Sequence, residues 1–210
     1  MSGALTLAVI AKAPVAGRVK TRLCPPCTPA EAAALAEAAL RDTLAAMARA
    51  GRGIRRAIVL DGAPGPWAGD AEVIAQRGAG LDERLAHAFT DLGPAPALIV
   101  GMDTPQLTGA LLAETLAALD HHDAVLGPAT DGGYWGIGLR HPDPRALLGV
   151  PMSAGHTLAA QRLRLSALGL HVAETTTLVD VDTIGDAAVV AAQAPDTRFA
   201  HAFARLAVAV

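Results

Sequence analysis

The chain has 210 residues, a length that suits one domain built around a single hydrophobic core. Its net charge of -3 and aromatic content of 3% argue against nucleic-acid binding, which needs a broad basic surface and stacking platforms. Hydrophobic residues make up 52% of the sequence, but no apolar run approaches the roughly 18 residues of a membrane span. The first apolar run leads straight into a Lys/Arg-rich loop, as a first strand does and a signal peptide does not. We therefore expect a cytoplasmic protein with no membrane span and no nucleic-acid partner.

The N-terminal half of the chain alternates predicted strands with predicted helices. A capping box marks the start of the first helix, with Thr28 as the N-cap, Pro29 at the first helical position and Glu31 three residues after Thr28. This helix is expected to run to about Ala50, and a second one from Leu81 to about Leu92. Short apolar runs predict three strands, at Leu5–Ala11, Ile54–Leu60 and Ala71–Ala75.

The C-terminal half continues this alternation. The apolar run Ala97–Gly101 predicts a strand buried on both faces, followed by a helix from Pro105 to about Leu119. The elements expected next are a strand at Ala124–Gly127, a glycine-rich loop at Pro128–Gly138, a helix capped by Ser153 that ends near Leu168, a strand at Leu170–Leu178 and two short helices. This order predicts an α/β fold with three layers, α/β/α, and a mostly parallel central sheet. The loops at the carboxyl ends of the strands then converge on one edge.

Asp103 follows the buried strand Ala97–Gly101, within Gly-Met-Asp-Thr-Pro, and no partner for its charge is obvious in the sequence. Because ligands of open α/β sheets bind beyond the carboxyl ends of the strands, Asp103 is placed to hold a metal-bound phosphate. The alternative is that Asp103 caps the next helix, with Pro105 in its first turn. Spacing alone does not separate the two interpretations.

The loop after the first strand carries four basic residues, Lys12, Arg18, Lys20 and Arg22, with Gly17 among them. Such a loop suits a polyphosphate, which backbone amides and basic side chains can surround. The spacing fits neither a Walker motif nor the Gly-x-Gly-x-x-Gly dinucleotide fingerprint. The alternative is a solvated basic loop without a ligand. Its position directly after a buried strand favours phosphate binding.

Asp180 and Asp182 are two residues apart in an extended segment, which places both carboxylates on one side. Val179 and Val181 are then expected to face the core. Carboxylates that close repel each other unless a cation lies between them, so a divalent metal is the natural third party. A capping arrangement follows the pair, however, and Asp182 could merely precede a helix. The basic loop and this pair fall on the same edge as Asp103, which favours metal binding by Asp103 and leaves helix capping to Thr104.

The glycine-rich loop holds Asp131, Gly132 and Gly133 next to the only tyrosine, Tyr134, and one of the two tryptophans, Trp135. Glycines let a backbone approach a ligand closely, and the aromatic pair can stack on a ring or pack beneath the loop. Asp131 could bind a hydroxyl group or start an Asx turn. The histidines show no spacing typical of metal ligands.

Cys24 and Cys27 form a Cys-Pro-Pro-Cys unit. This unit invites a redox or zinc interpretation. A zinc site needs a second pair of ligands, and the sequence offers none. A rigid proline turn that leads into the first long helix is the simpler explanation.

Four motifs occur in order: Lys12-Ala-Pro-Val-Ala-Gly-Arg-Val-Lys-Thr-Arg-Leu23, Gly101-Met-Asp-Thr-Pro105, Gly127-Pro-Ala-Thr-Asp-Gly-Gly-Tyr134 and Asp180-Val-Asp-Thr183. With them the sequence resembles the glycosyltransferase-A-like "transferase 1" family, domain-of-unknown-function family 2064. The resemblance implies a nucleotide-diphospho-sugar transferase fold, formed here by residues 1–210 as a single domain.

The resemblance also implies roles for individual residues. The nucleotide phosphates would be bound by Lys12, Gly17, Arg18, Lys20 and Arg22, and the metal by Asp103, Asp180 and Asp182. Gln76 and the stretch Gly80–Arg84 lie where the family has a loop on the nucleotide side. The family usually carries glycine at the position of Asp82, so this chain departs from the family in the region that would meet the base.

The function expected from these observations is a metal-dependent transferase that uses Mg²⁺ or Mn²⁺. Its donor would be a nucleoside triphosphate or a nucleotide sugar, and its small acceptor, phosphorylated or hydroxylated, would be held by residues 131–135. Lys20, Asp103 and Asp131 are the expected catalytic residues. Nucleotidyl transfer and glycosyl transfer are not separated by the sequence. The alternatives are a non-catalytic nucleotide-binding protein of the same fold and a Cys-Pro-Pro-Cys redox module. The oligomeric state is left open, with a homodimer as one alternative.

Overall fold

The computed structural model describes residues 5–207 and contains one seven-stranded sheet. Its strands lie in the order β3-β2-β1-β4-β6-β5-β7, and β6 is antiparallel to both of its neighbours while every other pair is parallel. The strands are β1 (Thr6–Lys12), β2 (Arg55–Asp61), β3 (Glu72–Ala75), β4 (Ala97–Gly101), β5 (Ala124–Pro128), β6 (Tyr134–Leu139) and β7 (Val172–Glu174). The mostly parallel sheet expected from the sequence is confirmed.

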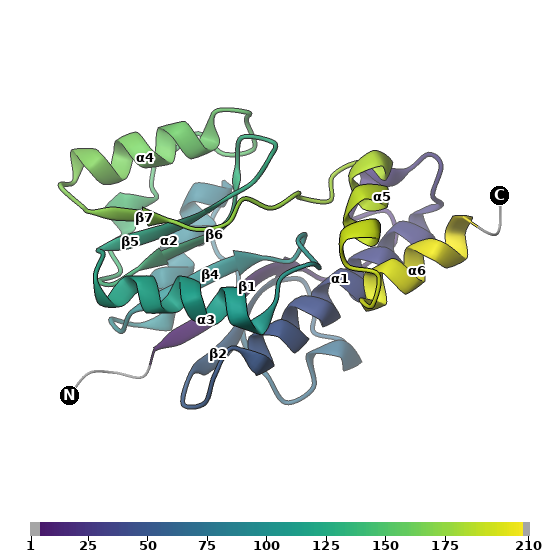
Figure 1. Cartoon of the computed structure of the whole chain (residues 1–210), viewed down its shortest axis with the longest axis horizontal. Helices are drawn as coiled ribbons and strands as arrows, with labels where there is room; N and C mark the ends of the chain where they lie inside the picture. Colours follow the sequence, from purple (N-terminus) through teal and green to yellow (C-terminus); the bar gives the residue numbers. More distant parts are fainter. Residues whose placement is uncertain (1–4, 208–210) are drawn as a thin grey trace.

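Helices cover both faces of this sheet (Figure 1). Two helices, α1 and α3, share a core with one face, and α2 and α4 share a core with the other. The last two, α5 and α6, pack on the outer side of α1, away from the sheet. Their bounds are α1 (Pro29–Arg49), α2 (Leu81–Leu92), α3 (Gly109–Ala117), α4 (Thr157–Ala167), α5 (Ile184–Gln193) and α6 (Arg198–Ala207). None of the helices within residues 5–207 is long and apolar enough to cross a membrane.

The start of α1 shows the predicted capping box. The backbone N–H of Glu31 donates to the Thr28 hydroxyl oxygen at 3.3 Å, and the Glu31 carboxylate accepts from the backbone N–H of Thr28 at 2.7 Å. The two bonds satisfy two of the N–H groups that a helix start leaves without partners. Because alanines dominate its buried face, α1 can lie close to the sheet and to the C-terminal helices at once.

The helix behind β4 begins later than predicted. Thr108, and neither Asp103 nor Thr104, is the N-cap of α3, and its hydroxyl accepts from the backbone N–H of Leu111 at 3.1 Å. The prediction of a helix from Pro105 was therefore wrong at its start. The Gln106 side chain donates from Nε2 to the carbonyl of Val179 at 2.7 Å, so the residues after β4 are held by the C-terminal part of the chain instead of by a helix.

The predicted loop at Pro128–Gly138 is largely a strand. A turn at residues 129–133 leads directly into β6, which lies between β4 and β5. Gly138 is needed in the middle of this strand, because a Cβ atom there would meet Cγ1 of Val125 at 2.6 Å. In the sequence, two glycines within six residues are typical of a loop. In the structure they lie in a strand, and side chains from the neighbouring strands fill the space beside them.

Two further boundaries differ from prediction. Helix α4 begins at Thr157, with His156 in the N-cap position, so Ser153 does not cap it. The predicted strand Leu170–Leu178 is shortened to β7, with one isolated bridge between Leu178 and Ala129 beyond it. Residues 175–183, here called the connecting segment, run extended from β7 to α5 across the edge of the sheet (Figure 1).

A buried carboxylate fixes the C-terminal helix to α1. Asp42 is 8% exposed and accepts hydrogen bonds from the backbone N–H groups of Arg198 at 3.1 Å and Phe199 at 2.8 Å, the first two residues of α6. It therefore serves as a helix cap supplied from another part of the chain. Phe199 packs beside it in the core between α1, α5 and α6.

We expect Asp42→Ala to lower the free energy of unfolding by about 2 kcal/mol, because the first two N–H groups of α6, of which that of Phe199 is buried, lose their acceptor. Urea denaturation followed by circular dichroism measures this change. Asp70→Ala is the matched control, because Asp70 is exposed and makes no hydrogen bond or ion pair within residues 5–207. Equal stability of the two variants would contradict the capping role.

Candidate active site

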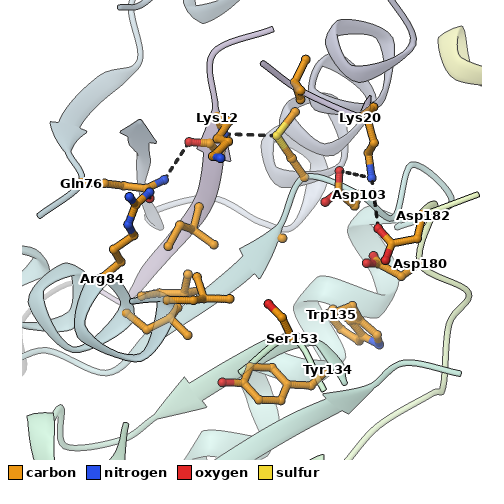
Figure 2. A pocket seen from close by; sticks show the side chains of 18 of the residues that line it. Lys12, Lys20, Gln76, Arg84, Asp103, Tyr134, Trp135, Ser153, Asp180 and Asp182 are labelled. Carbon is orange, nitrogen blue, oxygen red and sulfur yellow. Dashed lines mark hydrogen bonds and ion pairs between the residues drawn. The ribbon is translucent and has the colours of Figure 1, made fainter. Parts of the chain in front are cut away.

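A cleft of about 620 Å³ opens at the carboxyl ends of β1 and β4 (Figure 2). The basic loop after β1 and the connecting segment form its charged side, and α2 with the end of β3 forms the opposite side. Ten of the residues predicted for the site line it: Lys12, Arg18, Lys20, Arg22, Gln76, Asp103, Tyr134, Trp135, Asp180 and Asp182. The remaining predicted residues, Gly17, Asp131, Gly132 and Gly133, do not line the cleft.

The three predicted metal ligands are brought together by a single backbone pairing. The N–H of Val181 donates to the carbonyl of Asp103 at 3.0 Å, which fixes the connecting segment beside the end of β4. Val181 is 1% exposed, so the carboxylates of Asp180 and Asp182, on the other side of the segment, line the cleft. The predicted alternation, with Val181 towards the core and its two neighbours towards the cleft, is confirmed. Together with the pairing to Asp103, it brings carboxylates from two distant parts of the chain to one place.

Two cations of the basic loop are already paired with these carboxylates. Lys20, whose side chain is 8% exposed, donates from Nζ to the carbonyl oxygen of Val181. Its Nζ also lies 2.7 Å from Oδ1 of Asp103, an ion pair without the angle of a hydrogen bond, and 4.0 Å from Oδ1 of Asp182. Arg22 Nη1 lies 2.6 Å from Oδ2 of Asp182. Figure 2 shows the Lys20 ammonium between the Asp103 and Asp182 side chains.

The other two cations of the loop remain available to a ligand. Lys12 and Arg18 are exposed, and within residues 5–207 neither side chain makes a hydrogen bond or an ion pair. Gly17 has φ +76°, a left-handed conformation that glycine adopts without strain, and it turns the loop between them. The loop therefore presents two unpaired positive charges at the cleft.

Asp180 carries the strongest electrostatic perturbation of the three carboxylates. Burial raises its pKa from 3.8 to about 7, and the negative charges of Asp103, Asp182 and Asp131 add to this effect while Lys20 opposes it. A carboxylate in such surroundings is stabilised by any cation that can approach it. The excess of negative charge at this end of the cleft therefore favours a divalent ion.

The donor set is chemically suited to magnesium or manganese, which prefer carboxylate oxygens. Oδ1 of Asp103 is buried and accepts no hydrogen bond, and the cation that lies beside it in the structure is the Lys20 ammonium at 2.7 Å. In the part of the chain that the structure describes, however, no three Asp, Glu, His or Cys side chains lie close enough to one another to bind one metal ion. The carboxylates thus fit the ion by chemistry, and the Lys20 ammonium occupies the position next to Asp103.

We expect the perturbed pKa of Asp180 to make stability depend on pH when metal is absent. Because its pKa is about 7 in the folded protein and near 3.8 otherwise, the carboxyl is protonated in the native state over a range where the unfolded chain is ionised. The wild type should therefore lose stability as pH rises from about 4 through 7. Asp180→Asn should be more stable than wild type at pH 8 and lose much of that advantage at pH 5, as urea denaturation in EDTA can measure. The same advantage at both pH values would contradict the raised pKa.

Gln76 lines the cleft, but its side-chain amide is used within the protein. Nε2 donates to the carbonyls of Ala11 at 2.7 Å and Val59 at 3.0 Å, and Oε1 accepts from Arg84 at 3.2 Å. Arg84 in turn lies 2.9 Å from Asp61, where β2 ends. Gln76 therefore ties the ends of three parallel strands together at the cleft wall, whereas its predicted contact with a nucleotide stays untested. Arg84, the last residue of the stretch Gly80–Arg84 that the resemblance placed on the nucleotide side, also lines the cleft.

The predicted acceptor loop divides into two parts. Asp131 accepts from the backbone N–H of Gly133 at 2.8 Å, which is the Asx-turn alternative considered for the sequence. Tyr134 and Trp135 line the cleft from β6, but Trp135 is 2% exposed and donates from Nε1 to the carbonyl of Thr176 at 2.9 Å. The indole is thus built into the cleft wall and is not free to stack on a ligand ring.

The Tyr134 hydroxyl belongs to a buried polar network. It donates to Oε1 of Gln161 at 3.3 Å, and Nε2 of Gln161 donates to the carbonyl of Ala146 at 2.7 Å. Burial raises the pKa of Tyr134, so the phenol stays protonated. Its hydroxyl is committed to this network, and the residue contributes shape to the cleft.

Ser153 is a cleft residue that was interpreted from the sequence only as a helix cap. It has φ +55°, and within residues 5–207 the only other non-glycine residue with a left-handed φ is Lys20, at +50°. Both line the cleft. Figure 2 shows the Ser153 hydroxyl directed towards the middle of the cleft, and it makes no hydrogen bond with the described part of the chain. Strained backbone of this kind often accompanies binding sites, but it has no signal in the sequence.

The two cysteines do not form a disulfide. Burial raises the pKa of the Cys27 thiol, and the nearby Cys24 and Glu31 add to the shift. A redox module needs a depressed thiol pKa, so the direction for Cys27 is opposite to the one that this alternative requires.

Several solved structures are similar to the protein along most of its length. A "putative nucleotide-diphospho-sugar transferase" from Desulfovibrio desulfuricans G20 matches with a TM-score of 0.85 and 28% identity, over 96% of this chain and 93% of that one. A nucleotidyl transferase from Methanothermobacter thermautotroptrophicus matches with a TM-score of 0.61 and 15% identity, over 91% of this chain and 97% of that one.

Glucosyl-3-phosphoglycerate synthase from Mycobacterium tuberculosis, in complex with Mn²⁺ and UDP, matches with a TM-score of 0.56 and 11% identity, over 85% of this chain and 71% of that one. At such identities the last two structures show the fold alone, which nucleotidyltransferases and glycosyltransferases share. The search of curated proteins returned no significant match. Residues 30–154, more than half of the chain, match the family described as "uncharacterized protein conserved in bacteria (DUF2064)", and the protein therefore belongs to this family.

Proposed function

We propose that the protein is a transferase that depends on a divalent metal and uses a nucleotide donor, either a nucleoside triphosphate or a nucleotide sugar. The observation that carries the proposal is the convergence of three carboxylates, Asp103, Asp180 and Asp182, with the basic loop in one cleft at the carboxyl ends of β1 and β4. Phosphates need the cations, and a metal that bridges phosphates to protein needs the carboxylates.

In this proposal Lys12 and Arg18 bind the phosphates, because neither side chain has a hydrogen-bond or ion-pair partner within residues 5–207 that the phosphates would have to displace. The three carboxylates hold Mg²⁺ or Mn²⁺, which supplies Lewis-acid stabilisation of phosphate charge when bound. Lys20 and Arg22 neutralise further negative charge during transfer. No nucleophilic side chain is required, since a hydroxyl or phosphate of the acceptor attacks the donor directly.

We propose that the acceptor binds on the side of the cleft formed by Tyr134 and Ser153, whose hydroxyl makes no hydrogen bond within residues 5–207. Asp131 lies outside the lining of the cleft, but its charge reaches Asp180 and contributes to the raised pKa there. A catalytic role of Asp131 would therefore act through the electrostatics of Asp180. The acceptor itself is expected to be a small phosphorylated or hydroxylated molecule.

A thermal-shift screen tests the proposal. Binding to the native state adds about 3 kcal/mol to the free energy of unfolding at a ligand concentration 100 times the Kd, and the melting temperature rises as a result. Nucleoside triphosphates and nucleotide sugars are each measured with Mg²⁺, with Mn²⁺ and with EDTA, and we expect a shift that needs the metal. No shift with any donor under any of these conditions would refute the proposed function.

Product analysis then separates the reactions. Release of pyrophosphate indicates nucleotidyl transfer, and release of a nucleoside diphosphate indicates glycosyl transfer. A metal-dependent shift without either product, across a panel of phosphorylated and hydroxylated acceptors, would instead favour the non-catalytic nucleotide-binding protein.

A further inference from the structure

We infer that Lys20 and Arg22 form an ionic latch that closes the metal site of the free protein, so that metal and nucleotide bind cooperatively by opening it. This inference rests on the proposed function and adds to it how the two ligands are coupled. It starts from a division within the basic loop. Lys12 and Arg18 are exposed and have no side-chain partner within residues 5–207, whereas Lys20 and Arg22 are paired with Asp103 and Asp182 on the same side of the cleft.

Lys20 is the centre of the latch. Its ammonium touches three groups at once: the Val181 carbonyl, Oδ1 of Asp103 at 2.7 Å and, farther off, Oδ1 of Asp182 at 4.0 Å. With 8% of its side chain exposed, it fills the space between the end of β4 and the connecting segment. Its left-handed backbone conformation turns the side chain towards this space, so the local geometry and the ion pairs act together.

Arg22 closes the outer side of the same site. Its Nη1 lies 2.6 Å from Oδ2 of Asp182, and its side chain is 70% exposed. An exposed pair of this kind is weak and exchanges easily. The latch therefore has a buried half at Lys20 and a labile half at Arg22, and both halves belong to the loop that is expected to meet the phosphates.

A metal ion and the Lys20 ammonium compete for the same oxygen of Asp103, because two cations at that range repel each other strongly. A metal bound by Asp103 therefore displaces Lys20. The displaced ammonium remains on the basic loop, beside Lys12 and Arg18, where it can contact a phosphate. A nucleotide that draws Lys20 away in turn exposes Asp103 to the metal, and by linkage each ligand strengthens the binding of the other by the same factor.

The test compares Mn²⁺ binding, measured from the electron paramagnetic resonance of the free ion, with nucleotide binding, measured by calorimetry. The nucleotide probes are ADP, GDP, CDP and UDP, each with and without Mn²⁺. The variants are Lys20→Met and Arg22→Met. For Mn²⁺ binding without nucleotide the matched control is Lys12→Met, which removes a positive charge from the same cleft but from a side chain without a carboxylate partner in the described part of the chain.

We expect Lys20→Met to bind Mn²⁺ about tenfold more tightly than wild type when no nucleotide is present, because the competing cation is gone. Arg22→Met should show a smaller gain, and Lys12→Met little change. For the nucleotide probe that binds, Lys20→Met should weaken binding and reduce the cooperativity with Mn²⁺. One substitution would thus change the affinities for the two ligands in opposite directions.

Unchanged or weaker Mn²⁺ binding by Lys20→Met would overturn the latch. A gain no larger than that of Lys12→Met would also overturn it, because the effect would then reflect the general field of the cleft. Failure of every nucleotide probe to bind the wild type would count against the proposed function, whereas the Mn²⁺ comparison would still decide whether Lys20 competes for the carboxylates. Circular dichroism checks that each variant is folded, and Arg22→Met provides a second reading if Lys20→Met is not.

Discussion

Asp103→Asn is expected to lower turnover of the donor roughly 100-fold or more while the protein stays folded. Asparagine keeps the size of the side chain and leaves the backbone carbonyl free to accept from Val181 at 3.0 Å. It removes the negative charge that is expected to hold the metal and that pairs with Lys20 at 2.7 Å. Because a bound metal and the charges around it commonly contribute most of the rate enhancement in such a transfer, the loss should appear in kcat.

Turnover is measured with the donor identified by the thermal-shift screen, at saturating Mn²⁺, beside Mn²⁺ affinity and the melting temperature. Asp120→Asn is the matched control, since the Asp120 side chain is exposed and makes no hydrogen bond or ion pair within residues 5–207. Normal turnover by Asp103→Asn would show that the metal assignment is wrong. A large fall in melting temperature would mean instead that Asp103 acts through the structure of the connecting segment.

The largest effect on stability is expected from Gly132→Ala. Gly132 has φ +86°, and a Cβ atom there would meet the carbonyl carbon of Gly155 at 2.6 Å, a backbone atom that cannot rotate away. The turn before β6 and the loop before α4 are therefore packed backbone to backbone. The strained φ and the overlap together should cost roughly 3 kcal/mol in the free energy of unfolding.

Gly169→Ala separates the two causes. Gly169 has nearly the same conformation, φ +73°, but a Cβ atom there would have no neighbour within 4 Å. This control should cost only about 1 kcal/mol, which is the effect of the left-handed conformation alone. Urea denaturation of both variants gives the difference. If Gly132→Ala were no less stable than Gly169→Ala, the close contact with Gly155 would not be the reason for glycine at this position.

Elements whose signals are local were well predicted from the sequence. The capping box at Thr28 and Glu31 marked the start of α1, and the bounds of α2 agree with its expected range, because helix periodicity and caps depend on residues only a few positions apart. The buried strand β4 was equally clear, since a strand covered on both faces is apolar throughout.

The errors arose where distant residues decide the structure. Gly136 and Gly138 made β6 look like a loop, yet they lie in a strand because Val100 and Val125 occupy the space beside them. The start of α3 moved to Thr108 because the connecting segment binds the residues after β4. Both the side-chain packing around β6 and the contact of the connecting segment with the residues after β4 involve residues far apart in the sequence, so no local sequence pattern indicates them.

The site was predicted residue by residue but not in its internal contacts. Charged residues in loops that follow parallel strands meet at one edge of the sheet. The sequence therefore predicted that Lys20, Asp103 and Asp182 lie in one cleft, as they do. It could not show that Lys20 is paired with the carboxylates while Lys12 has no partner within residues 5–207, because this depends on which loop bends across the cleft. Ser153 was missed as a cleft residue for a related reason, since its exposure follows from packing around α4.

The connecting segment makes the acidic side of the cleft dependent on helices that lie far from any ligand. Asp180 and Asp182 lie just before α5, and α5 and α6 hold that end of the segment by packing on α1 and through Asp42. A truncated protein ending before Ile184 would keep all seven strands and the four helices that cover the sheet. Its last residues would fray as free chain ends do, and the two carboxylates with them. Such a shortened chain should retain the cations of the basic loop and lose the proposed affinity for divalent ions, which would make the C-terminal helices the anchor of Asp180 and Asp182.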